Sequence, residues 1–255
     1  MPNTVVFVMK NKPYKKYSPS WTLITGATQG IGEALVKNLS SSHSNLVIHY
    51  RNNLSKAESL KEYCLSKNCQ AEILFGDFST KKSTQKFINS YLDKFESTKC
   101  LINCVGDFLL LPLLETSLDQ FNEIFQSNFF SSLALMQSLT PSLIKTKGKI
   151  LNFGCSGMSS PAAQRHSPAY SFAKQALQNA TTTFSRELAK HHVCVNMISP
   201  GVLENSENLE SVSPHLPFKQ PGSLKDIVEA ATFLINNKSD YITGQNIEVS
   251  GAFRL

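Results

Sequence analysis

The sequence of 255 residues lacks several features that would decide its class at once. None of its six cysteines forms a CxxC pair, and the nearby histidines give no zinc-binding spacing. The apolar run at residues 5–9 follows no basic residue and is too short for a signal peptide, and the run at 108–114 falls far short of the ~20 residues of a membrane span. We therefore expect a cytoplasmic protein with free thiols, no metal site and no membrane partner.

Charged residues are also few, at 17% of the chain, and the positive excess is local. Four lysines, and no acidic residue, lie within the first twenty positions. The rest of the chain is close to neutral and contains no basic stripe or nucleic-acid-reading motif, so we expect no nucleic-acid partner. The composition, with 41% hydrophobic residues, is that of a globular protein. We expect one domain over residues 21–255, preceded by an extension over 1–20 that is an edge strand or a disordered arm.

Short apolar runs alternate with longer amphipathic ones along this domain. The expected strands are residues 22–25, 46–50, 71–75, 100–104, 149–153, 193–198 and 246–249. The longest expected helix, 169–190, carries apolar side chains three or four positions apart. Alternating strands and helices predict an α/β fold, a doubly wound parallel sheet of the Rossmann type, with ligands at the carboxyl ends of the strands.

A glycine-rich segment lies directly between the first expected strand and the next helix. It reads Thr-Gly-Ala-Thr-Gln-Gly-Ile-Gly over residues 25–32. Glycines let the backbone turn tightly beside a pyrophosphate, and the free amide groups at a helix start attract the anion. The segment therefore predicts a dinucleotide site.

The spacing TGxxxGIG resembles the short-chain dehydrogenase/reductase family, and the resemblance extends to about Gly251. An NAD-dependent enzyme would place an acid at the end of the second strand, yet no Asp or Glu occurs between Glu33 and Glu58. Arg51 stands there instead, where it would accept a 2′-phosphate, so we expect NADP(H) as cofactor. The alternative for Arg51 is a solvated surface arginine.

The resemblance implies further cofactor contacts along the chain. They are expected at Gly26, Thr28, Gln29, Gly30, Ile31, Tyr50, Arg51, Asn52, Asp77, Phe78, Asn103, Gly106, Tyr170, Lys174, Pro200, Gly201 and Val202. Asn205 stands where the family often has a threonine.

Tyr170 and Lys174 are four positions apart, which places them on one face of the longest expected helix. Tyr63 and Lys67 have the same spacing but lie on the expected adenosine side. A nearby cation would favour the tyrosine anion, so Lys174 would prepare Tyr170 for proton transfer. The resemblance implies that Tyr170 is the general acid of a hydride transfer to a carbonyl or imine, and that Lys174 also holds the cofactor ribose.

Two further catalytic residues follow from the resemblance. Asn128 matches a helix asparagine that positions a water leading to the lysine. The family's substrate-polarising serine falls on Cys155 when counted from the strand, and nearer Gly157 when counted back from Tyr170. We expect Ser156 to supply this donor because a hydroxyl donates better than a thiol; Cys155, Ser159 or no direct donor are the alternatives.

The segments 107–114 and 203–218 should border the substrate. The chain resembles 3-oxoacyl-acyl-carrier-protein reductases, which implies a 3-oxoacyl thioester as substrate. Tyr50-Arg51 together with Gly76-Asp77-Phe78-Ser79-Thr80 also resembles the pteridine and dihydromonapterin reductase branch, which implies a dihydropterin instead. A chain that binds NADP without turnover, as a sensor or scaffold, is the alternative outside enzymology. The family usually forms tetramers, for which the side chains of Phe129, Phe130, Leu133, Leu135 and Phe184 would supply a face unless they belong to the core.

Overall fold

The computed structural model describes residues 20–42, 45–158, 166–207, 209–236 and 238–254. Ser159 and residues 1–19, for which a strand or an arm was expected, lie outside the described residues. The described strands form one sheet in the order β3-β2-β1-β4-β5-β6-β7, and every neighbouring pair is parallel.

The strands are β1 (Trp21–Ile24), β2 (Asn45–Tyr50), β3 (Ala71–Phe75), β4 (Thr98–Asn103), β5 (Lys149–Phe153), β6 (Cys194–Pro200) and β7 (Asn246–Val249). The α-helices are α1 (Gly30–Leu39), α2 (Leu54–Ser66), α3 (Lys81–Lys94), α4 (Leu118–Phe125), α5 (Ser131–Thr146), α6 (Pro168–Leu188), α7 (Leu209–Val212) and α8 (Leu224–Asn236). A π-helical turn, η3 (Gln126–Phe130), joins α4 to α5, and single 3₁₀ turns are η1 (Ser40–Ser42), η2 (Leu113–Glu115), η4 (Ala189–His191) and η5 (Ser213–His215).

The doubly wound parallel sheet predicted from the sequence is confirmed. Each expected strand is present within two residues of its expected bounds. The apolar runs of β1, β2 and β4 are buried on both faces because helices cover each side of the sheet, whereas the edge strands β3 and β7 are only partly buried.

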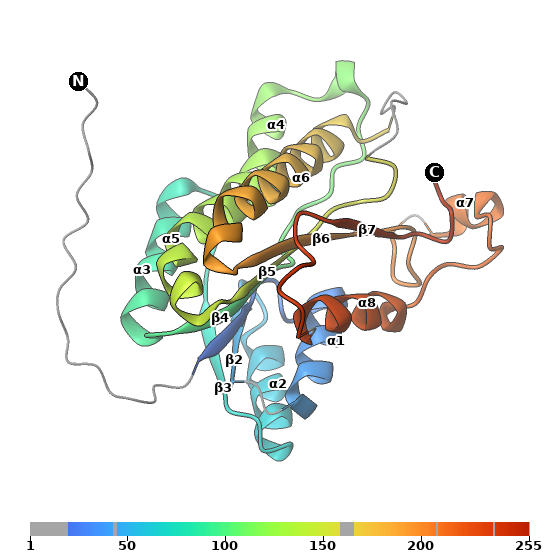
Figure 1. Cartoon of the computed structure of the whole chain (residues 1–255). Coiled ribbons are helices and arrows are strands. Elements are labelled where there is room, and N and C mark those ends of the chain that lie inside the picture. Colours follow the sequence, from blue (N-terminus) through green and yellow to red (C-terminus); the bar gives the residue numbers. More distant parts are fainter. Residues whose placement is uncertain (1–19, 43–44, 159–165, 208, 237, 255) are drawn as a thin grey trace, which may run out of the picture.

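Two helical layers enclose the sheet (Figure 1). Helices α1, α2 and α8 pack over one face, where Leu35, Leu60 and Ile227 are buried in one core cluster. Helices α3, α5 and α6 cover the other, where Phe87 and Leu139 belong to a second cluster. In the part of the chain that the structure describes, no helix is long and apolar enough to cross a membrane.

The residues considered for a tetramer face are placed differently from one another. Leu135 is 1% exposed and belongs to the core, which corrects its assignment to a surface. Phe129, Leu133 and Phe184 are half-buried against the same cluster, whereas Phe130 is 48% exposed. The tetramer stays a prediction.

Strand order reverses between β1 and β4, the two central strands. The connections leaving their carboxyl ends therefore run to opposite faces and leave a crevice between them. This crevice is where the sequence predicts a ligand.

Candidate active site

Two adjoining cavities lie along the carboxyl ends of the strands. We call the first, of about 360 Å³ and lined by Gly26, Gln29 and Arg51, the glycine-loop cavity. The second, of about 760 Å³ and lined by Tyr170 and Lys174, is the tyrosine cavity. Ile31, Cys104, Gly106 and Asn205 line both cavities, so the two form one continuous cleft.

The glycine-rich segment forms one wall of the glycine-loop cavity. Gly26 and Gly30 have positive φ angles of 60° and 51°, which glycine adopts without strain. Gly32 packs so closely that an added Cβ would overlap the Gly26 carbonyl oxygen. Gln29 makes no side-chain cap with any described residue, so the first amide groups of α1 keep their hydrogen-bonding capacity for an anion.

His49 fixes the position of this loop, a function that the sequence analysis missed. Its Nδ1 accepts a hydrogen bond from the Gly26 amide at 2.9 Å, so the neutral ring carries its proton on Nε2 and donates to the Gly76 carbonyl at 3.2 Å. The ring also stacks on Phe78, with centroids 4.5 Å apart. Burial lowers the pKa of His49 to about 4, so the ring stays neutral and ties the glycine loop to the end of β3.

Arg51 and Asn52 lie on the wall of the glycine-loop cavity, as expected. Arg51 follows β2, is half-exposed and lies 3.8 Å from the carboxylate of Asp107. Asp107 follows β4, which lies on the opposite side of β1 from β2. This carboxylate also lines the cavity and was not anticipated, because it comes from a different strand end.

Three of the expected cofactor residues turn their side chains elsewhere. Tyr50 packs edge-on against Phe75, with ring centroids 5.9 Å apart. The Asp77 carboxylate accepts hydrogen bonds from the amide and hydroxyl of Ser79. Asn103 is 2% exposed and donates to Asn152 at 2.8 Å within the core. None of these three side chains lines either cavity, whereas the neighbouring Phe78 and Gly106 do.

Tyr170 and Lys174 both line the tyrosine cavity from the first turns of α6. Lys174 Nζ donates to the carbonyl oxygen of Phe153, at the end of β5, at 2.9 Å and lies 5.5 Å from the centre of the Tyr170 ring. Phe108 packs edge-on against that ring, with centroids 5.1 Å apart.

Burial dominates the electrostatics of this pair. It lowers the pKa of Lys174 to about 8, although the thiols of Cys155 and Cys104 act in the opposite sense. Burial also raises the pKa of Tyr170 above its ordinary value, and the Cys155 thiol adds to that rise. Burial therefore outweighs the lowering of the Tyr170 pKa that was expected from Lys174, whose ammonium donates to the Phe153 carbonyl. The phenol stays protonated near neutral pH.

Asn128 lies on the π-helical turn η3 rather than on a regular helix. Its Nδ2 donates to the carbonyl oxygens of Asp107 at 2.8 Å and Ile124 at 3.0 Å. Its Oδ1 is buried without a hydrogen-bond partner among the described residues. A Cβ on Gly106 would overlap this Oδ1 and lie 3.1 Å from Lys174 Nζ, so the amide and the ammonium meet at this glycine.

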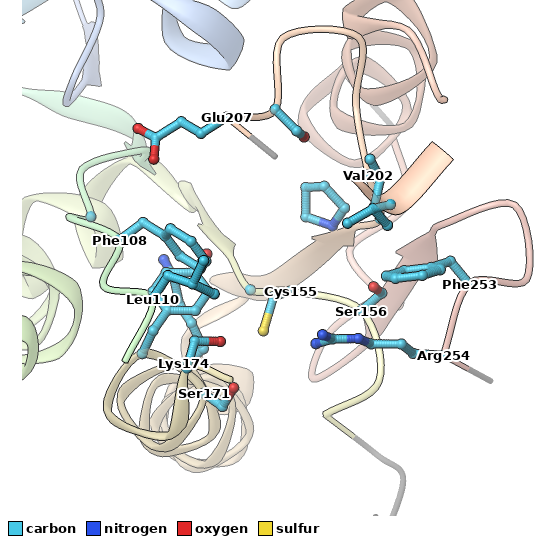
Figure 2. Close-up of a pocket in the computed structure, with 18 of the residues that line it drawn as sticks. Phe108, Leu110, Cys155, Ser156, Ser171, Lys174, Val202, Glu207, Phe253 and Arg254 are labelled. Atoms are coloured by element: carbon cyan, nitrogen blue, oxygen red, sulfur yellow. The ribbon is translucent and has the colours of Figure 1, made fainter. Parts of the chain in front are cut away.

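Cys155, rather than Ser156, lies beside the tyrosine and lysine. Its thiol acts on the pKa values of both Tyr170 and Lys174, whereas Ser156 lies on the side of Phe253 and Arg254 (Figure 2). Both residues line the tyrosine cavity. The count from the strand is the more reliable one, because additional loop residues before Tyr170 do not move a residue next to the strand end.

The remaining walls come from segments far apart in the sequence. Pro200, Gly201 and Val202 line the tyrosine cavity as expected. The segments 107–114 and 203–218 contribute Phe108, Leu110, Asn205, Ser206, Glu207, Ser211, Val212 and His215. Phe253 and Arg254, which follow β7, also line this cavity and were not predicted.

A cleft of this kind, with an anion-binding loop at one end and a buried phenol at the other, is typical of dinucleotide-dependent oxidoreductases. A sequence model of a family described as Enoyl-(Acyl carrier protein) reductase matches residues 26–253. The chain belongs to this family, within the short-chain dehydrogenases/reductases.

Relatives and solved structures agree with that membership. A diacetyl reductase [(S)-acetoin forming] of Staphylococcus epidermidis is 28% identical over 90% of this chain and 96% of the relative. The 3-oxoacyl-[acyl-carrier-protein] reductase FabG of the same species is 26% identical over 91% and 98%.

A blue fluorescent protein from a metagenomic library, solved in complex with NADPH, has a TM-score of 0.85 at 22% identity over 92% of this chain and 98% of that one. An acetoin dehydrogenase from Enterobacter cloacae has a TM-score of 0.84 at 23% identity over 94% and 96%. These two likenesses show the fold.

The buried neutral His49 predicts a loss of stability in acid. His49 in the unfolded chain binds a proton below its ordinary pKa of 6.5, whereas His49 in the folded protein, with a pKa of about 4, stays neutral. Between pH 7.5 and 5 this group alone should cost about 2 kcal/mol of unfolding free energy. Urea unfolding at the two pH values measures the loss, and His49→Gln should reduce it by that amount. Equal losses in both proteins would contradict the assignment.

Proposed function

We propose that the chain is an NADPH-dependent reductase that transfers a hydride to a carbonyl group, of the 3-oxoacyl thioester type. The observation that carries this proposal is that Tyr170 and Lys174 line a cavity continuous with the glycine-loop cavity. The names of the relatives from Staphylococcus epidermidis, which act on diacetyl and on 3-oxoacyl chains, support a carbonyl over an imine.

The glycine-loop cavity suits the phosphates of a dinucleotide. Its wall contains two glycines in the left-handed region and the amide groups at the start of α1. Arg51 stands on the same wall, where its guanidinium would bind the 2′-phosphate that distinguishes NADPH from NADH. The complex of the blue fluorescent protein with NADPH is consistent with this choice.

The residues of the tyrosine cavity suit proton transfer to a reduced carbonyl. Bound NADPH supplies the hydride that adds to the carbonyl carbon. Tyr170 donates its phenolic proton to the carbonyl oxygen, which gives the alcohol and leaves NADP⁺. The raised pKa of Tyr170 keeps that proton on the phenol until the oxygen gains negative charge, so Tyr170 acts as the general acid.

Lys174 and Asn128 would restore the proton. With a pKa of about 8, Lys174 is mainly protonated at pH 7 and stabilises the phenolate left after transfer. The unpartnered Oδ1 of Asn128 lies close to Lys174 at Gly106, where it would accept a hydrogen bond from a water that resupplies the lysine.

The dihydropterin alternative is weakened by the positions of its motif residues. Tyr50 and Asp77, which suggested it, line neither cavity. Tyr170, Lys174 and Asn128 are close together, as proton transfer requires. This arrangement argues against a sensor that binds NADP without turnover. NADPH oxidation with diacetyl, acetoacetyl coenzyme A and dihydrobiopterin separates the three functions. Turnover of neither carbonyl would refute the proposal.

Replacing Tyr170 with Phe should lower kcat by about 10²–10⁴-fold, because the ring is kept while the proton donor is removed. NADPH binding, followed by the fluorescence of the nicotinamide, should remain within about threefold. Turnover close to that of the wild type would refute the general-acid role of Tyr170.

Replacing Arg51 with Ala should lower kcat/KM for NADPH by about 10-fold or more and leave that for NADH nearly unchanged, because only NADPH presents a phosphate to the guanidinium. Asp107→Asn is the matched variant. It removes the carboxylate facing Arg51 and should raise kcat/KM for NADPH relative to that for NADH. An unchanged ratio of the two kcat/KM values in the Arg51 variant would identify a surface arginine.

Replacing Cys155 with Ser should raise kcat for ketone reduction by about 10-fold, because a hydroxyl donates a stronger hydrogen bond to the developing oxyanion than a thiol does. Ser156→Ala should cost far less than the roughly 10²–10³-fold that follows the loss of a direct donor. The reverse pattern would return the donor role to Ser156, as the sequence predicted.

A further inference from the structure

The charged groups on the wall of the tyrosine cavity are unevenly distributed. Among the described residues that line it, Lys174 and Arg254 are the basic side chains other than histidine, and Glu207 is the acidic one. Lys174 lies with Tyr170 at the reacting centre. Arg254 reaches into the cavity from the opposite side, with its guanidinium directed toward Cys155, and Glu207 lies at another end of the cavity (Figure 2).

Arg254 is held in place by close backbone packing. A Cβ on Gly157 would lie 2.7 Å from the Arg254 Cβ and 3.1 Å from its carbonyl oxygen, so only a glycine permits this approach. The amide of Phe253 donates to the Ser250 carbonyl at 3.0 Å, which closes a turn after β7. The Arg254 guanidinium lies 5.3 Å from the centre of the Phe253 ring. The side chain therefore projects from a fixed backbone.

The guanidinium has no carboxylate partner in the part of the chain that the structure describes. Glu248 is one acid in this region, since it and Arg254 both act on the pKa of Cys155. Its Oε2 instead accepts a hydrogen bond from the Gly157 amide at 3.3 Å. A guanidinium with free donors in a concave site binds carboxylates in a bidentate manner.

Cys155 links this guanidinium to the reacting phenol. Its side chain lies between Lys174 and the Arg254 guanidinium (Figure 2), and its thiol also raises the pKa of Tyr170. Because Tyr170, Cys155 and Arg254 line the same cavity, a substrate whose carbonyl oxygen meets Tyr170 can present an anionic group to the guanidinium.

We propose that Arg254 determines substrate specificity by binding a carboxylate of the substrate itself, so that the ketone reduced is a short oxo acid. This inference rests on the proposed carbonyl reductase function and replaces the 3-oxoacyl thioester by a free oxo acid as the substrate. The reaction converts the oxo acid, NADPH and a proton to the hydroxy acid and NADP⁺, and the carboxylate takes no part in the bond changes.

The test compares each of three acids with its own ethyl ester, which keeps the ketone and removes the charge. The acids are pyruvate, acetoacetate and levulinate. Acetoacetyl coenzyme A is the seventh compound; it has the ketone of acetoacetate, and its negative charges are phosphates far from that ketone. Steady-state NADPH oxidation gives kcat and KM for the wild type and for Arg254→Gln, Arg254→Lys and Arg186→Gln. Arg186 is an exposed arginine outside both cavities and serves as the matched control.

We expect the wild type to prefer one of the acids over its ester. Arg254→Gln should lower kcat/KM for that acid by about 10–100-fold, mainly through KM, and change the ester by less than about threefold. Arg254→Lys should restore part of the loss because it restores the charge without the bidentate fork. Arg186→Gln should leave both substrates unchanged.

Several results would overturn the oxo-acid assignment. Reduction of an ester but of no acid would refute it while leaving the reductase function intact, as would equal losses for acid and ester in Arg254→Gln. A loss confined to acetoacetyl coenzyme A would assign Arg254 to the phosphates of a carrier arm instead. No oxidation of NADPH with any of the seven compounds would refute both the reductase function and the assignment that rests on it.

Discussion

The hydrogen bond from Lys174 to the carbonyl oxygen of Phe153 is the interaction on which the arrangement of the site depends. It joins the first part of α6 to the carboxyl end of β5, and it compensates a buried ammonium that would otherwise be costly. Because Tyr170 lies one turn before Lys174, the same bond sets the position of the phenol. The packing of α6 against β5 therefore also determines the geometry of the site.

Buried polar side chains hold in place the segments that line the two cavities. His49 ties the glycine loop to the end of β3, and Asn103 and Asn152 form a buried chain with Thr181 of α6. His49, Asn103 and Asn152 lie near the carboxyl ends of β2, β4 and β5. Buried polar contacts of this kind give a specific arrangement to a region that apolar packing alone would leave less well defined.

The sequence predicted those features whose cause is local. Apolar runs buried on both faces gave the strands within two residues, and the glycine spacing and the i,i+4 pair of Tyr170 and Lys174 identified the two cavities. Features that depend on the juxtaposition of distant segments were missed. Asp107 meets Arg51 only because β2 and β4 lie on either side of β1, and Arg254 meets Gly157 only because β5 and β7 lie on either side of β6.

For some strand-end residues the sequence analysis named residues at the correct segment but was wrong about where their side chains point. Asn103 reads as a polar strand-end residue whether its side chain points into the cleft or into the core. Cys155 and Ser156 differ by one position, and a loop of unusual length before Tyr170 makes counting ambiguous. Side-chain direction at the end of a strand depends on the backbone beyond it, which local patterns do not encode.

The π-helical turn that carries Asn128 has a consequence for how the chain can vary. Shortening residues 126–130 by one would restore regular helix, but it would rotate everything after it by about 100° about the helix axis. The apolar side of α5, with Leu135, Leu139 and Leu143, would then face away from the sheet that it covers. The widened turn is therefore locked by the packing of the helix that follows, and the asparagine keeps its position as long as that packing is kept.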